Sequence, residues 1–141
     1  MVYGDGKVAP AVAPSDAKVW NKDTTGTLFT IQSPSGMYFR VNGTGATAFD
    51  AWVDAMVKYN VPYEPSESSY GKGITSMFGL TMTQDAEGNY TYWNQDLAVD
   101  GAWSFNSAMM SNTNVADGSQ MLLYYAAYGA TVDKAPIYGT S

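Results

Sequence analysis

The chain has 141 residues, which is enough for one domain with a buried core. Hydrophobic residues make up 45% of the chain and charged residues only 14%, well below the roughly 25% that is usual in soluble proteins. The net charge of -6 would repel phosphate backbones, so nucleic acid is not expected as a partner. Because cysteine and histidine are both absent, thiol catalysis, histidine-dependent triads and metal sites built on these ligands are excluded, and we expect no cofactor.

The start of the chain predicts an extended arm over residues 1–18, followed by a single domain over residues 19–141. Gly4, Gly6, Pro10 and Pro14 stand among small residues there, without a hydrophobic period. Chain ends are held in place only where something binds them. We therefore expect the arm and the tail over residues 137–141 to dock on the domain or, preferentially, on a neighbouring copy.

The first regular elements predicted are a β-hairpin and a helix. Residues 27–31 and 37–41 flank a turn that contains Pro34 and Gly36. A helix over residues 47–60 can begin at Thr47, which is a good N-cap. Its helical spacing predicts one buried stripe, made of Phe49, Trp52, Val53, Met56 and Val57.

The segments after the helix predict further strands. We expect a short strand over residues 61–64, a polar connection over 65–69, and a second hairpin formed by 81–83 and 90–93. The apolar run over residues 120–128 predicts a strand that is covered on both faces. Residues 102–113 indicate either an inserted loop or another strand pair. The predicted fold class is α+β, mostly β, with a β-grasp-like mixed sheet packed on one helix.

Several short motifs occur in a distinctive order between Thr27 and Tyr128. They are Ser69-Tyr70-Gly71 followed by Ile74 to Leu80, then Trp93 ahead of Val99-Asp100-Gly101, and Val115 to Gly118 before the last strand. In this order they resemble the transcobalamin-like C-terminal domain family, a β-grasp-like domain of many secreted prokaryotic proteins. In transcobalamins this domain closes over a corrinoid together with a helical domain, which this chain lacks.

The resemblance implies a set of ligand-binding positions for a corrinoid or, as a second choice, a glycan. The positions that carry over are Tyr70, Ile74, Trp93, Asp100 and Gly101, and the aromatic Trp103 is added as a further wall of a concave site. An isolated half-site loses the enclosure that buries a ligand. This binding module is therefore the alternative hypothesis and not the first.

Location is predicted from what the sequence lacks and from two glycosylation sequons. No apolar run approaches the ~20 residues of a membrane helix, so no membrane insertion is expected. Residues 1–15 lack the basic start and apolar stretch of a signal peptide, and we expect a secreted, prokaryotic-type protein whose signal has been removed. The sequons at Asn42 and Asn89 agree with an extracellular or cell-surface location.

The leading functional hypothesis is a non-catalytic extracellular structural protein that assembles with itself into a cell-surface layer, sheath or filament. Natural monomers protect their sheet edges with charged residues. The strand-like segments predicted here carry only Arg40 and Lys72, so sheet edges and terminal arms are the expected contacts. Scattered acidic residues without an accompanying motif do not indicate an enzyme.

Overall fold

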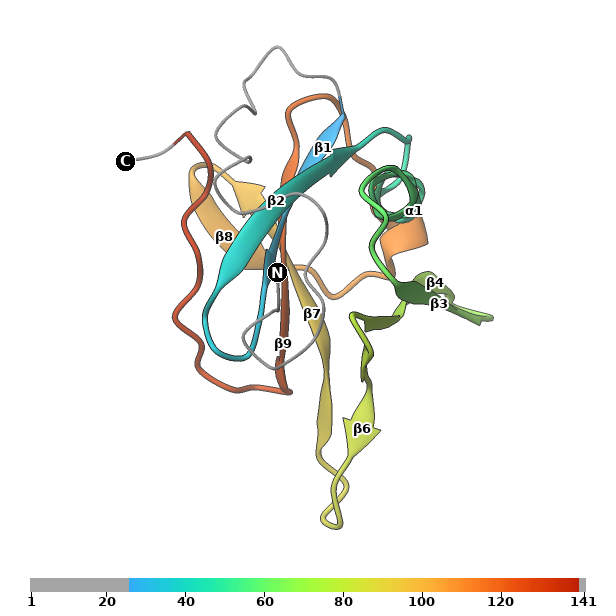
Figure 1. The fold of residues 1–141 in the computed structure, drawn as a ribbon, viewed down its shortest axis with the longest axis vertical. Helices are drawn as coiled ribbons and strands as arrows, with labels where there is room; N and C mark the ends of the chain where they lie inside the picture. The colour runs from blue at the N-terminus through green and yellow to red at the C-terminus, as the bar shows by residue number, and fades with distance from the viewer. Residues whose placement is uncertain (1–25, 140–141) are drawn as a thin grey trace.

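The computed structural model describes residues 26–139, which form a mixed β-sheet with one helix against it (Figure 1). The predicted arm over residues 1–18 lies outside the described residues. The elements in chain order are β1 (Thr27–Gln32), β2 (Tyr38–Gly43), α1 (Ala48–Lys58), β3 (Tyr63–Ser68), β4 (Gly71–Met77), β5 (Leu80–Thr81), β6 (Thr83–Gln84), β7 (Tyr90–Val99), β8 (Ala102–Phe105), the 3-10 turn η2 (Met110–Asn112) and β9 (Gln120–Ala127).

The main sheet has the strand order β2-β1-β9-β7-β6, and β8 pairs with β7 beside this path. The central strands β1 and β9 are parallel, with Leu28 opposite Gln120, whereas every other pair is antiparallel. The chain forms the β1–β2 hairpin, then the helix α1, and its last strand β9 runs parallel to β1. This is the β-grasp arrangement. The predicted class, α+β and mostly β, is confirmed.

The central strands are buried because both faces of the sheet are covered. All six residues of β1 are buried, and so are Met121, Leu122, Leu123 and Tyr124 of β9. The predicted strand over residues 120–128 is β9. Its coverage on both faces holds for residues 121–124, whereas Ala127 and Tyr128 are exposed. Strands buried on both faces read as continuous apolar runs because neither set of alternating side chains meets water.

The helix covers one face of the sheet, and its limits agree with the prediction. Thr47 Oγ1 accepts a hydrogen bond from Asp50 N at 3.2 Å, and the left-handed backbone of Asn60, with φ of 58°, follows its end. The buried face differs from the predicted stripe, because Val57 is 66% exposed. The face turned to the sheet consists of Ala48, Ala51, Trp52, Ala55 and Met56. Small alanines let the helix approach the sheet closely, so the helix is rotated toward them.

The opposite face of the sheet is covered by the C-terminal strap, which we define as residues 131–139. Leu122 and Tyr124 pack there with Ala135, and Val132 and Trp103 lie at the margin of this cluster. In Figure 1 the strap runs alongside the sheet from the end of β9. The expected docking of the tail is therefore seen on the chain's own sheet as far as residue 139.

Two segments differ from their prediction. Residues 65–69 were predicted as a connection, but β3 extends to Ser68 and pairs with β4, with an irregularity between Glu64 and Pro65. Proline and charged residues are tolerated there because β3 is an edge strand, which needs partners on one side only. Residues 102–113 form β8 and the turn η2, so the strand-pair alternative describes their first part.

Candidate functional site

The two tryptophans among the predicted ligand positions lie on opposite faces of the main sheet. Trp93 is 4% exposed in the core on the helix side, and its Nε1 donates a hydrogen bond to Leu80 O at 2.9 Å. Trp103 is opposite Ala98 in β7. Ala98 is two residues from Asp96, which contacts Lys134 of the strap, and residues two apart in a strand point to the same face. Trp103 therefore points to the strap, where its Nε1 donates to Ala135 O at 2.7 Å.

The other predicted positions are equally dispersed. Asp100 and Gly101 form the turn between β7 and β8, with φ of 51° and 80°, as expected for a two-residue hairpin loop. Ile74 packs against the core from β4, the middle strand of a second sheet with the strand order β3-β4-β5. Tyr70 is 80% exposed beside a shallow polar cleft of ≈ 360 Å³. The structure does not bring the six positions together into one wall, so they do not form a common ligand site.

The two sequon asparagines also have different surroundings. Asn42 Oδ1 accepts a hydrogen bond from Tyr59 OH at 2.5 Å. Asn89 is exposed in the loop between β6 and β7, where its backbone N donates to Asp85 Oδ1 at 2.9 Å. The Asp85 carboxylate also accepts from Glu87 N, and these hydrogen bonds lower its pKa below the ordinary value, foremost the one from the Asn89 backbone. Asp85 thus holds the loop that presents Asn89.

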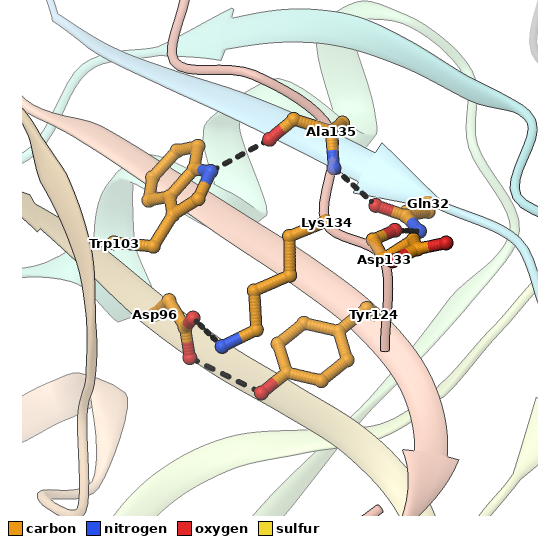
Figure 2. Close-up of polar contacts among 7 residues, drawn as sticks. All are labelled: Gln32, Asp96, Trp103, Tyr124, Asp133, Lys134 and Ala135. Carbon is orange, nitrogen blue, oxygen red and sulfur yellow. Dashed lines mark hydrogen bonds and ion pairs between the residues drawn. The ribbon is translucent and has the colours of Figure 1, made fainter. Parts of the chain in front are cut away.

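A buried polar cluster joins the strap to the main sheet (Figure 2). Asp96 of β7 is fully buried, and Lys134 Nζ lies 2.6 Å from its Oδ2. Tyr124 OH donates to Asp96 Oδ1 at 3.2 Å. Burial raises the pKa of Tyr124, and the negative charge of Asp96 raises it further. Burial works against the ammonium of Lys134, but the hydrogen bond and charge of Asp96 outweigh it and raise the pKa of Lys134.

Side-chain contacts with the strap backbone continue this cluster. Gln32 Nε2 donates to Asp133 O at 2.7 Å, and Gln32 Oε1 accepts from Ala135 N at 2.8 Å (Figure 2). Farther along, Gln120 binds Tyr138 in the same two-sided way. Because amides and a tryptophan take the place of a strand partner, the strap is held without belonging to the sheet. Each contact marked in Figure 2 joins two residues of the fold, which is typical of a structural cluster.

The outer strand β8 forms an uncharged edge of the main sheet. It pairs only with β7 among residues 26–139, and its sequence Ala-Trp-Ser-Phe carries no charge. Phe105 is 54% exposed and Val99, at the start of the same hairpin, is 50% exposed. Asn106 N donates to Gln95 O at 3.0 Å, so the backbone groups of Asn106 point toward β7. Along an antiparallel pair, the backbone groups of successive residues point alternately toward the partner strand and away from it. The backbone N–H and C=O of Trp103 and Phe105 therefore point away from β7.

The edge of the second sheet is different in character. β3 carries Glu64, Pro65 and Glu67, and the register shifts between Glu64 and Pro65. Charges, proline and irregular pairing are the devices that prevent a strand from adding to an edge. The strand edges are therefore not as free of charge as the sequence suggested. β8 is the longest edge strand that lacks these devices, since the uncharged edge strands β5 and β6 have two residues each.

Two comparisons with known proteins found no relative: no family model matches the chain, and no curated protein matches it. Within residues 26–139 no helix is long and apolar enough to cross a membrane, and no three acidic side chains gather in a way that would hold a metal ion. The function is therefore inferred from the contacts and exposed surfaces of the chain itself.

Proposed function

We propose that the chain is a non-catalytic, extracellular structural domain that assembles with copies of itself, and that a neighbouring copy adds to β8. The observation that carries the proposal is the uncharged edge of β8. Strand addition satisfies outward N–H and C=O groups by main-chain hydrogen bonds. Trp103 and Phe105 present such groups, and the exposed side chains of Phe105 and Val99 add apolar area for a partner to cover.

The segment proposed to add to β8 is the N-terminal arm of a neighbouring copy. β8 has only four residues, so a short extended segment is sufficient to pair with it. Proline cannot donate to a strand ladder, which restricts the arm to its first nine residues, ahead of Pro10. The low overall charge of 14% supports the same use, because neutral polar surfaces cost less to desolvate than ionised ones.

The test compares the assembly state of four versions of the full chain: the natural sequence, Phe105→Lys, a deletion of residues 1–18, and Val57→Lys. Light scattering after gel filtration and electron microscopy of the concentrated protein measure assembly. We expect ordered assemblies from the natural chain and from Val57→Lys, which adds the same charge on the exposed side of α1. Phe105→Lys and the deletion should give folded monomers. Unchanged assembly of these two variants, or a natural chain that stays monomeric, contradicts the proposal.

A further inference from the structure

Figure 1 shows the hairpin of β6 and β7 extending from the body of the molecule, and this hairpin carries an aromatic hollow. It is a cleft of ≈ 600 Å³, lined by Met82, Gly88, Asn89, Tyr90, Tyr92 and Tyr128. Tyr128 is 70% exposed, Met82 is 52% exposed and Tyr90 is 46% exposed. Large side chains this exposed and this close together indicate a surface that binds something.

Strand register places the three lining tyrosines on one face of the sheet. Tyr128 N donates to Tyr90 O at 2.9 Å, just beyond the pair of Thr91 and Ala127, so these two tyrosines are cross-strand neighbours. Tyr92 is two residues from Tyr90 and therefore points to the same side. This is also the side of Asp96 and of the strap. The cleft is thus the part of the strap face that the strap leaves uncovered.

The chemistry of the lining selects among ligands. None of the six lining residues carries a formal charge, and the exposed loop above them contains Asp85 and Glu87. An anionic ligand would meet negative charge there and no cation. The tyrosines combine apolar ring faces with hydroxyl groups, and Asn89 adds an amide that both donates and accepts. Burial raises the pKa of Tyr92, and proximity to Tyr128 raises it further, so the Tyr92 hydroxyl stays a protonated donor at neutral pH.

We propose that this tyrosine cleft binds a neutral carbohydrate. A sugar ring has an apolar face that packs on a tyrosine ring, and hydroxyls at its rim that pair with phenol and amide groups. The inference does not depend on β8 or on assembly, because the cleft is formed within one copy.

Two sources of the carbohydrate are consistent with the geometry, namely a free polysaccharide and an N-linked glycan on Asn89. Asn89 lines the cleft and belongs to the sequon Asn89-Tyr90-Thr91. A glycan attached there would lie directly beside Tyr90. The experiment therefore needs an arm without glycosylation and an arm with it.

In the first arm, protein made without glycosylation is titrated with neutral hexasaccharides of glucose, mannose and N-acetylglucosamine. Amide chemical shifts are followed by NMR at up to millimolar sugar, because an open cleft that buries little of its ligand binds weakly, with a Kd on the order of 0.1–1 mM. Shifts should concentrate at residues 82–92 and at 126–128. Tyr128→Ala should weaken binding by about tenfold, whereas Tyr128→Phe, which keeps the ring, should weaken it less.

The control for these variants is Tyr70→Ala, which removes an equally exposed tyrosine outside the cleft and should leave binding unchanged. The thermal midpoint of each variant verifies folding. The inference is overturned if no hexasaccharide shifts the cleft residues, if Tyr128→Ala binds as well as the natural chain, or if an acidic oligosaccharide or cyanocobalamin binds there in preference.

In the second arm, the protein is made in a host that glycosylates the sequon and is compared with Thr91→Val, which removes the sequon and leaves every lining residue of the cleft in place. Failure of added sugar to shift the cleft of the glycosylated chain, together with recovery in Thr91→Val, identifies the attached glycan as the occupant. Equal binding by both identifies a free polysaccharide. Either result supports carbohydrate as the ligand class, and assembly measured by light scattering is a separate readout that tests only the proposal about β8.

Discussion

Replacing Lys134 by methionine tests whether the Asp96 cluster holds the strap on the sheet. The variant keeps the length of the side chain but leaves the buried Asp96 carboxylate with Tyr124 OH as its remaining partner in the cluster. Removing one partner of a buried ion pair costs about 3–5 kcal/mol. Since the Lys134 side chain is 33% exposed, water can reach the vacated position, and we expect a loss of about 2–3 kcal/mol in the free energy of unfolding.

The thermal midpoint followed by circular dichroism measures this loss. For a domain of this size the expected decrease is about 6–12 °C. Lys58→Met serves as the control, because Lys58 is exposed on α1 and contacts only the face of Tyr59 among the interactions described, and its effect should stay within about 0.5 kcal/mol. Adding Asp96→Asn to Lys134→Met should restore part of the stability, because a neutral amide costs less to bury than an unpaired carboxylate.

A decrease smaller than about 0.5 kcal/mol in Lys134→Met would refute the reasoning, because it would equal the effect of an ordinary surface substitution. Strap contact can be followed separately through the indole N–H of Trp103, which donates to Ala135 O. Its NMR signal should move toward that of an unbonded indole if the strap is released. A stable variant with an unmoved Trp103 signal would show that Lys134 does not hold the strap.

Three further outcomes are expected. Gly43→Ala should lower the free energy of unfolding by about 2 kcal/mol or more, because an added Cβ would overlap the backbone of Ala51 and Ala55 in α1. The control is Gly73→Ala, where the atoms nearest to an added Cβ lie at 3.4 Å. Equal urea midpoints for the two variants would contradict this prediction. The free energy of unfolding should fall in alkali. In the folded protein the pKa values of Tyr124 and Lys134 lie above their ordinary values of 10.0 and 10.5. Their contribution to the free energy of unfolding is therefore complete below pH 10 and is lost as the pH rises through the folded pKa values. In Lys134→Met, thermal midpoints between pH 9 and 11 should therefore fall less steeply than in the natural chain. Trp93→Phe should lose about 1–2 kcal/mol of the free energy of unfolding by leaving Leu80 O without its donor. Chemical denaturation measures this loss, and a value below about 0.5 kcal/mol would contradict the prediction.

The elements that local patterns predicted correctly are those whose signals lie within a few residues. The helix has its cap at Thr47 and its end near Asn60, and the first hairpin has its turn at Pro34 and Gly36. The buried stripe of the helix was only partly correct. Val57 has the right spacing, yet Ala51 and Ala55 face the sheet in its place, because close approach to Gly43 favours small residues over large ones.

Strand β3 could not be predicted from its own residues. Glu64, Pro65 and Glu67 are typical of a loop, and only the pairing with β4 along one side makes the segment a strand. The predicted ligand positions failed to converge for a related reason. Whether Trp93 and Trp103 share a face depends on the register of β7 and β8, which short motifs do not specify.

The sequence by itself determined the helix, the first hairpin and the last strand, because side-chain periodicity, caps and turn residues act over short distances. The tertiary structure alone decided which distant residues meet. Asp96 and Lys134 are 38 positions apart, and the cleft pairs Tyr128 with Tyr90 across two strands. These contacts depend on strand order and register, which the whole core sets by burying both faces of β1 and β9.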